Sequence, residues 1–381
     1  MAESYVIGVD FGSDSVRALI VNTETGENVG QGVACYPRWK AGLYQHPEYS
    51  IFRQHPLDYL ESLEKCITTA LAELTEEQKD YVIGIGVDTT GSTPVPVDKN
   101  GIPLALLDEF AENENAMFFL WKDHAAAAEA DEINKLFRNN SENDYTKYQG
   151  DYSAEWYWAK ILYAVRHDEA IRQAAYTWEE HCDWMTGILC GETRPEKIYH
   201  SACAAGHKAL WHSEWNGLPA ASVLEQLDPY LVQVRERYGN APQPSTVKVG
   251  TLCLEWAKKL GLKESTVISG SSFDAHAGAV GAGIQKKTFV CTMGTSCVDM
   301  FVEKPENLKG KDIQAYCGQA ENSILPGYVG VETGQAAFGD IFAWFKRLLE
   351  WPLAELAADE NSGISDELYK KVEDRILVML Q

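Results

Sequence analysis

The first 88 residues carry the pattern that most restricts the fold. Residues 5–10 alternate in polarity and, after a short polar loop, residues 16–22 and 28–36 do so again, which predicts a β-meander. From Pro56, leucine and isoleucine recur at helical spacing, and residues 81–88 form a continuous apolar run, as expected of a strand buried on both faces. A meander, a helix and a buried strand in this order predict an α/β layer rather than an all-β barrel.

The α/β pattern returns after a helical interval. Residues 111–263 are mainly helical in pattern, and the proline-rich stretch 238–250 is typical of a loop that crosses between layers. We expect a buried strand near residues 265–270 and a helix from about Asp274. Residues 287–303 predict two strands around a tight turn of sequence MGTS.

Length and charge limit the organisation and the partners of the chain. Single hydrophobic cores stop growing at roughly 250–300 residues, so 381 residues predict two domains, which we place at 1–265 and 266–381. The formal net charge of −23 and a pI near 4.8 argue against a nucleic-acid or anionic-membrane surface. A phosphate ligand must therefore be held by backbone amides, a bound cation or a few basic side chains.

Cysteine usage and the N-terminus predict a cytoplasmic protein. The nine cysteines form no CxxC pair, the N-terminus lacks the features of a secretory signal, and no segment approaches 18 uninterrupted apolar residues. His200, His207 and His212 lie close in sequence, but their spacing matches no zinc pattern. We therefore expect no zinc site among these histidines.

Two distant stretches share one pattern. Residues 6–21 and 289–302 each contain an apolar strand, a turn with glycine and hydroxyl side chains, and a second apolar strand. Such a turn can hold an anion, because glycine permits close backbone approach and the amides and hydroxyls donate to phosphate oxygens. Two such turns could hold one polyphosphate from two sides, although each alone is also an ordinary hairpin.

Seven motifs, taken together and in this order, resemble the bacterial L-ribulokinases. These belong to the carbohydrate kinase family that also contains glycerol kinase and xylulokinase. The resemblance covers nearly the whole chain, and each motif alone would be weak. The motifs are GVDFGSDSVRALIV, GVDTTGSTPVPVD, LWKDHAAAAEA, SACAAGHKALW, SSFDAHAGAVGAG, TMGTSCVDM and GVETGQAAFGD.

The resemblance implies a fold and an activity. The expected fold is α/β, with two actin-like domains of the ribonuclease-H type flanking a cleft. The expected activity is the ATP- and magnesium-dependent phosphorylation of L-ribulose to L-ribulose 5-phosphate, a step of L-arabinose catabolism. Family members are longer, so we expect this sequence to be a fragment or a truncated reading frame, with an incomplete second domain and no adenine site.

The resemblance also implies roles for individual residues. Asp274 matches the general base that acts on the sugar hydroxyl, and Asp10 matches the acid that holds hydrated magnesium. The positions that match ATP-phosphate contacts are Gly12, Ser13, Ser15, Arg17, Gly294, Thr295 and Ser296. The positions that match ketose contacts are Val95 and the loop around it, Trp121, Lys208 and Glu332, together with Asp274.

The chemistry of phosphoryl transfer asks for these residue types independently. A sugar hydroxyl is a poor nucleophile, so a carboxylate must accept its proton while cations and amides offset charge on the phosphoryl oxygens. An aspartate at a helix start suits this role, because the helix N-terminus keeps the carboxylate ionised. Lys208 could donate to ketose oxygens, and Trp121 could stack on a carbon face of the sugar.

Simpler roles remain open for the same residues. Asp274 could be a helix N-cap and Asp10 a solvated acid in a loop. Trp121 could be a core aromatic residue, Lys208 a solvated lysine and Glu332 a paired residue at a strand edge. The order of the seven motifs favours the functional roles, most strongly for Asp274.

Asp14 lies in the expected phosphate loop, where Coulomb repulsion disfavours an acid. The ribulokinases share this acid, so we expect it to point away from the phosphates or to pair with Arg17.

Other activities also remain open. One is a kinase of D-ribulose or xylulose, another is an actin-like ATPase or chaperone, and a third is a sugar-binding regulator. The motifs GHKALW and GVETGQ favour a sugar kinase over an ATPase, and the presence of Asp274 argues against a regulator. A homodimer is an open option.

Overall fold

The computed structural model describes residues 3–294, 297–309, 311, 318–335, 338–358, 370–372, 374–375 and 378. Its largest sheet has seven strands, and six of them follow the order β10-β11-β6-β1-β2-β3, while β12 pairs with β6 beyond the end of β11. The strand β6 pairs in parallel with each of β1, β11 and β12. The strands are β1 (Tyr5–Phe11), β2 (Ser15–Asn22), β3 (Asn28–Cys35), β6 (Val82–Thr89), β10 (Lys248–Thr251), β11 (Val267–Ser269) and β12 (Ser272–Phe273).

One face of this sheet carries the main hydrophobic core. The helices α2 (Pro56–Leu71), α7 (His181–Cys190) and α11 (Leu254–Leu260) contribute to the same buried cluster as the inward side chains of β1, β2 and β6. The predicted meander and the helix from Pro56 are confirmed. The expectation that β6 is buried on both faces is wrong, because its side chains alternate and that of Ile83 is 51% exposed.

A second core lies in the helical interval. It joins α4 (Ala127–Arg138), α5 (Tyr157–His167), α9 (Ala221–Leu227) and α10 (Pro229–Glu236) through buried aromatic and aliphatic side chains. The predicted helical character is therefore confirmed, with small sheets interspersed. The remaining elements of this half are α1 (Pro37–Lys40), α3 (Glu76–Lys79), α6 (Glu169–Ala174), α8 (Ala202–Lys208), β4 (Gln45–His46), β5 (Ile51–Gln54), β7 (Pro94–Val97), β8 (Phe118–Phe119) and β9 (Thr177–Glu180).

A second sheet of four strands has the order β13-β14-β16-β15 and is antiparallel throughout. It consists of β13 (Val290–Met293), β14 (Cys297–Glu303), β15 (Gln319–Glu321) and β16 (Val329–Gln335), with the short helix α13 (Pro305–Leu308) between β14 and β15. The two strands predicted around MGTS are confirmed. The boundary expected at residues 265/266 lies between β10 and β11 of the first sheet, and the second sheet begins only at Val290.

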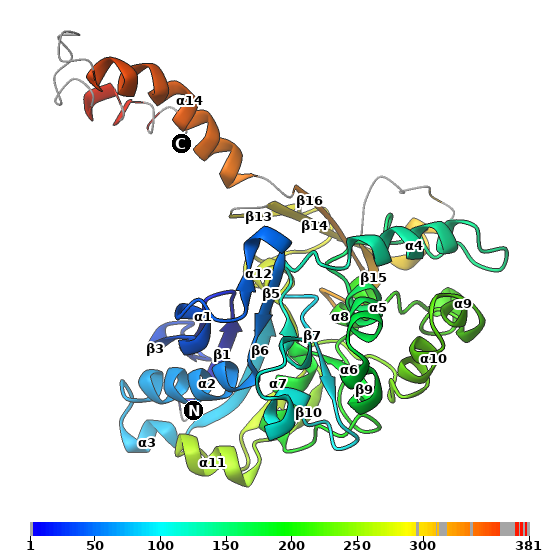
Figure 1. Cartoon of the computed structure of the whole chain (residues 1–381). Helices are drawn as coiled ribbons and strands as arrows, with labels where there is room; N and C mark the ends of the chain where they lie inside the picture. The colour runs from blue at the N-terminus through cyan, green and yellow to red at the C-terminus, as the bar shows by residue number, and fades with distance from the viewer. Residues whose placement is uncertain are drawn as a thin grey trace.

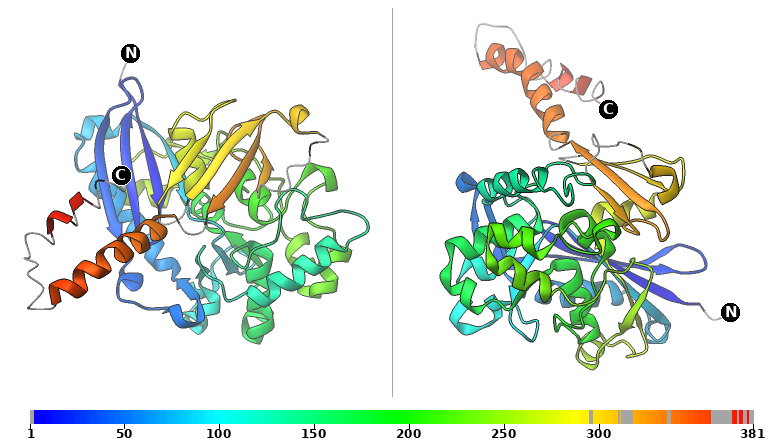
Figure 2. Two further views of the ribbon diagram at one scale, coloured as in Figure 1. Left: turned by 90° about the horizontal axis from the view of Figure 1, so that it is seen from above. Right: turned by 90° about the vertical axis from the view of Figure 1, so that its right-hand side faces the viewer.

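Two helices stand out by their positions. The helix α12 (Asp274–Gly281) contacts β6 and β12 of the first sheet as well as β13 and β14 of the second, so it connects the two. The helix α14 (Gly339–Ala358) runs away from both sheets and exposes Ile341, Trp344 and Trp351 (Figures 1 and 2). Among the described residues, no helix has both the length and the apolarity needed to cross a membrane.

Candidate functional site

Three carboxylates meet at one edge of the first sheet. Asp10 and Asp88 occupy opposite positions in the parallel pair of β1 and β6, and Asp88 also lies opposite Ser272 of β12. Asp274 follows β12 directly and begins α12. Because the carboxyl ends of parallel strands lie at the same sheet edge, the fold brings together acids that are far apart in sequence.

The charges in this group are incompletely balanced. Burial, followed by the charges of Asp10 and Asp274, raises the pKa of Asp88 to about 9. Arg17 Nη1 lies 3.2 Å from Asp10 Oδ2, but its side chain is largely exposed. Crowded carboxylate oxygens with little cationic compensation suit magnesium, which prefers oxygen ligands. The residues present therefore fit the metal that the sequence comparison implied.

Asp274 is placed at the first turn of α12. The N-cap is Phe273, and Asp274 Oδ1 accepts a hydrogen bond of 2.6 Å from the Ala275 amide. The described residues give Oδ2 no hydrogen bond, and the residue is exposed on one side. Burial on its other sides raises the pKa of Asp274, although the Ala275 amide opposes this shift. Asp274 thus satisfies one helix amide, as a capping residue would, and keeps one oxygen available.

The first turn is organised by side chains around it. The Gly12 amide donates to the Ser15 carbonyl at 3.0 Å, and Trp121 Nε1 donates to Ser13 Oγ at 2.8 Å. Gln54 Nε2 donates to the Ser13 carbonyl at 2.6 Å. Trp121 therefore lies against the expected phosphate turn, where its indole nitrogen fixes a serine hydroxyl.

Asp14 turns away from this site. Its Oδ1 accepts a 2.6 Å hydrogen bond from Trp39 Nε1, while Arg17 pairs with Asp10 instead. The expected alternative of an Asp14–Arg17 pair is therefore wrong. The other alternative, that Asp14 points elsewhere, agrees with the Trp39 contact.

Lys208 and Glu332 form a buried ion pair. Lys208 Nζ lies 3.1 Å from Glu332 Oε1, and only 8% of each residue is exposed. Burial lowers the pKa of Lys208, but the Glu332 carboxylate outweighs it and the net shift is upward. Burial opposes the charge of Glu332, yet Lys208 and two neighbouring histidines hold its pKa well below the ordinary value. The solvated-lysine alternative is wrong, and Glu332 is indeed paired.

The ion pair lies near the carboxylate edge. The pKa of Asp274 is raised by burial, and the positive charge of Lys208 weakly opposes this rise. The Lys208 ammonium lies 5.9 Å from the ring centroid of Phe273, the residue before Asp274. The Trp156 ring is also 5.0 Å from this ammonium. A cation, two carboxylates and aromatic surface thus lie within one neighbourhood.

Other expected positions are placed differently. Val95 lies in β7 opposite Glu179, and its side chain is fully buried, so only its backbone could face a ligand. Gly294 directly follows β13, while Thr295 and Ser296 lie outside the described residues. A separate hollow lined by Asp98, Lys99, Arg172 and Arg237 contains none of the expected site residues.

Sequence reasoning missed Asp88 and the histidines around Glu332. Asp88 ends an apolar run just before a hydroxyl-rich turn, which is the same signal that marked Asp10. His276 Nε2 lies 3.0 Å from Glu332 Oε2, and His207 Nδ1 lies 3.9 Å from Glu332 Oε1. Burial lowers the pKa of His207 to about 3, whereas Cys203 and Glu332 outweigh burial and raise the pKa of His276 to about 10.

Two family models match the chain. The N-terminal domain of the FGGY family of carbohydrate kinases matches residues 5–281. The chain belongs to this family. The C-terminal domain of the FGGY family matches residues 289–375, so the two matches follow the first and second sheets.

Two curated relatives of the chain are ribulokinases. The chain is 48% identical over 356 residues to the ribulokinase of Vibrio parahaemolyticus, covering 93% of this chain and 63% of that protein. It is 35% identical over 353 residues to the ribulokinase of Shouchella clausii, covering 90% of this chain and 60% of that protein. The chain thus spans less than two thirds of the length of these relatives.

Solved structures confirm the expected two-domain fold of this FGGY-family chain. Plasmodium falciparum glycerol kinase with ADP superimposes with a TM-score of 0.71 at 13% identity, covering 91% of this chain and 64% of that one. Xylulose kinase from Rhodospirillum rubrum gives a TM-score of 0.69 at 18% identity, covering 94% and 64%. At such identities the likeness concerns the fold alone.

Proposed function

We propose that the protein phosphorylates L-ribulose with ATP and yields L-ribulose 5-phosphate and ADP. The observation that carries this proposal is the placement of Asp274, with one free carboxylate oxygen, beside both the Asp10–Asp88 pair and the Lys208–Glu332 pair. The identity to ribulokinases supports this sugar over other ketopentoses. A role in L-arabinose catabolism, a cytoplasmic location and a homodimer remain predictions.

Asp274 would act as the general base. As the sugar hydroxyl oxygen attacks the γ-phosphorus, its proton passes to the free Asp274 oxygen, and the bond from phosphorus to the ADP oxygen breaks. Its raised pKa suits this transfer, because a base whose pKa lies closer to the working pH holds a proton more readily. The Ala275 amide fixes the carboxylate through the other oxygen.

Asp10 and Asp88 are the residues that would hold magnesium, Asp10 through water. Bound magnesium would offset charge on the phosphoryl oxygens. The turn from Gly12 to Ser15, with Arg17 beside it, would receive the phosphates through backbone amides and the Ser13 and Ser15 hydroxyls. Gly294, Thr295 and Ser296 are proposed as the second phosphate contact.

The ketose would be held by charged and polar groups opposite Asp274. Lys208 is a donor to sugar oxygens and Glu332 an acceptor from sugar hydroxyls, and their mutual pairing keeps both charges in place before the sugar arrives. Trp121 and the backbone near Val95 would contribute the remaining contacts. These groups would distinguish sugars by the positions of their hydroxyls, because a sugar that leaves buried polar groups unpaired binds more weakly.

The test measures sugar binding and ADP release separately. L-ribulose, D-ribulose, xylulose and glycerol are compared by calorimetric binding and by coupled ADP release, in the full-length protein and in its Asp274→Asn variant. We expect L-ribulose to be preferred and the variant to lose about 100- to 10,000-fold in turnover while its sugar affinity changes little. Asp131→Asn, an exposed acid of α4, is the matched control.

Three outcomes would contradict the proposal. Sugar-independent ADP release would indicate an actin-like ATPase. Sugar binding without turnover in the unaltered protein would indicate a binding protein. Full turnover in the Asp274→Asn variant would remove Asp274 from the chemistry.

A further inference from the structure

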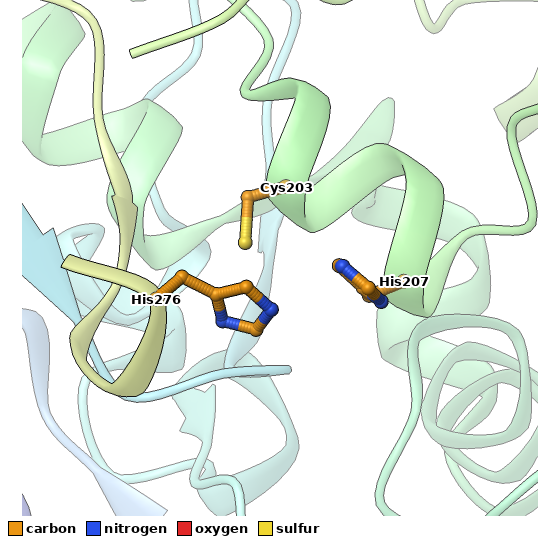
Figure 3. A group of neighbouring side chains, drawn as sticks. All are labelled: Cys203, His207 and His276. Carbon is orange, nitrogen blue, oxygen red and sulfur yellow. The ribbon is translucent and has the colours of Figure 1, made fainter. Parts of the chain in front are cut away.

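A second group of side chains lies behind the Lys208–Glu332 pair and has no part in the proposed phosphoryl transfer. Cys203 and His207 project from α8 one turn apart, and His276 faces them from α12 (Figure 3). One ligand atom from each residue lies within 4.8 Å of the others. The exposed fractions are 2% for Cys203, 0% for His207 and 2% for His276, so the group is shielded from solvent.

The imidazole nitrogens of this group are unsatisfied. Within the described part of the chain, neither nitrogen of His207 nor of His276 has a hydrogen-bond partner. His276 Nε2 approaches Glu332 Oε2 to 3.0 Å, but the orientation does not make a hydrogen bond. Buried polar atoms are nearly always paired, because an unpaired one costs about 1–3 kcal/mol. Apart from His276 Nε2 with its Glu332 contact, three such atoms lie in one place, which suits a site for a further ligand.

The spacing fits a tetrahedral metal. Residues four apart on a helix lie on the same face, so Cys203 and His207 can bind one ion together. Bond lengths of about 2.0–2.3 Å from zinc to nitrogen and sulfur place neighbouring ligand atoms about 3.3–3.8 Å apart. The ligand atoms lie up to 4.8 Å apart, and small side-chain rotations would bring them into that range.

Glu332 can supply the fourth ligand. Its Oε2 already lies beside His276, and its Oε1 is paired with Lys208. A thiolate and a carboxylate together would offset the charge of a divalent ion in this buried place. Thiolate and imidazole ligands select zinc-like ions, whereas magnesium takes oxygen ligands and dehydrates reluctantly. This group and the carboxylate edge would therefore select different metals.

We propose that Cys203, His207 and His276, with Glu332 as the fourth ligand, form a Zn²⁺ site. It would connect α8 and α12 with β16, and thus bring together elements of both sheets. Because Glu332 also pairs with Lys208, the ion would sit directly behind the proposed ketose contacts. The site stands on its own geometry and does not depend on which sugar is phosphorylated.

The test uses the chelator-stripped chain with Zn²⁺ and with Co²⁺ as a spectroscopic probe. We expect one Zn²⁺ per chain by elemental analysis, with protons released on binding, because the ligands must lose their protons. Co²⁺ should give a thiolate-to-metal charge-transfer band, which an excess of Mg²⁺ leaves unchanged and Zn²⁺ abolishes. Cys203→Ser should remove the band and weaken Zn²⁺ binding by at least about 10- to 100-fold.

Cys182→Ser is the matched control, because Cys182 is also buried and packs in the same small cluster as Cys203. This variant should keep the band. If circular dichroism shows that Cys203→Ser does not fold, the His276→Gln variant is tested in its place. The cobalt spectrum of the unaltered chain tests the proposal without any variant. Absence of the band in the unaltered chain, or equal loss in both cysteine variants, overturns the proposal.

Discussion

The helix α12 contributes to two chemically different groups of side chains, through two residues that are only two positions apart in sequence. Asp274, its first residue, is exposed and joins a set of oxygen ligands with Asp10 and Asp88. His276 is buried and joins sulfur and nitrogen atoms on α8. One short helix thus serves a solvent-accessible carboxylate edge and a closed group behind it. Burial, rather than proximity in sequence, therefore decides which chemistry a residue can take part in.

The largest stability effect should come from the buried ion pair that lies between these groups. Lys208→Met removes the lysine partner of the buried Glu332 and leaves His276 as its remaining cationic neighbour, so it should destabilise the fold by up to about 3–5 kcal/mol. Lys147→Met, which breaks an exposed pair with Glu214, should cost less than about 1 kcal/mol. Urea unfolding measures both, and equal losses would mean that burial does not distinguish the two pairs.

A substitution that disturbs the packing of α8 should change the stability less than loss of the buried ion pair. A Cβ at Gly206 would lie 2.4 Å from Ala320 Cβ of β15, so Gly206→Ala should destabilise by about 1–3 kcal/mol through overpacking. A methyl group added at Gly278 of α12 would meet no described atom within 4 Å, so Gly278→Ala should stabilise by about 0.5–1 kcal/mol. Thermal unfolding compares them, and the same sign in both would contradict the close contact of α8 with the second sheet.

The carboxylate edge should make stability fall as pH rises. The pKa of Asp88 is about 9 in the fold against an ordinary 3.8, so between these values the folded state keeps a proton that the unfolded state releases. Asp88→Asn should therefore flatten the decline and stabilise the protein at neutral pH, because the amide has no proton to retain. Unfolding is followed from pH 5 to pH 9, with Asp131→Asn as the control.

Magnesium gives a second readout of the same edge. It should stabilise the unaltered protein more than the Asp88→Asn variant, because the ion replaces the retained proton as the partner of the carboxylates. An unchanged pH profile in Asp88→Asn would remove Asp88 from the group.

The smallest effect should come from Asp14, which lies four residues after Asp10 but bonds Trp39. Asp14→Thr should change ATP affinity by less than about 2-fold, since the side chain faces away from the phosphate turn. Loss of the Trp39 hydrogen bond should cost about 1 kcal/mol of stability. Calorimetry measures the affinity, and a large gain would mean that Asp14 faces the phosphates.

Local patterns in the sequence predicted much of the fold. The meander, the helix from Pro56, the helix from Asp274 and the two strands around MGTS depend on residues close in the chain, and all are present. The predictions failed for residues whose burial or partner depends on distant parts of the chain. Ile83 was expected to be buried within its apolar run, yet about half of the residue is exposed. Asp14 accepts a hydrogen bond from Trp39 and does not pair with the nearby Arg17.

Ordered motifs along the chain predicted the family, and the resemblance to that family marked Asp274 as the candidate base and Asp10 as the candidate metal ligand. Only the tertiary structure added Asp88 to that site, since its place depends on the register between β1 and β6. The same holds for Cys203, His207 and His276. The four-residue spacing of Cys203 and His207 is readable in the sequence, but only the position of α8 beside β12 and the start of α12 adds His276 to them.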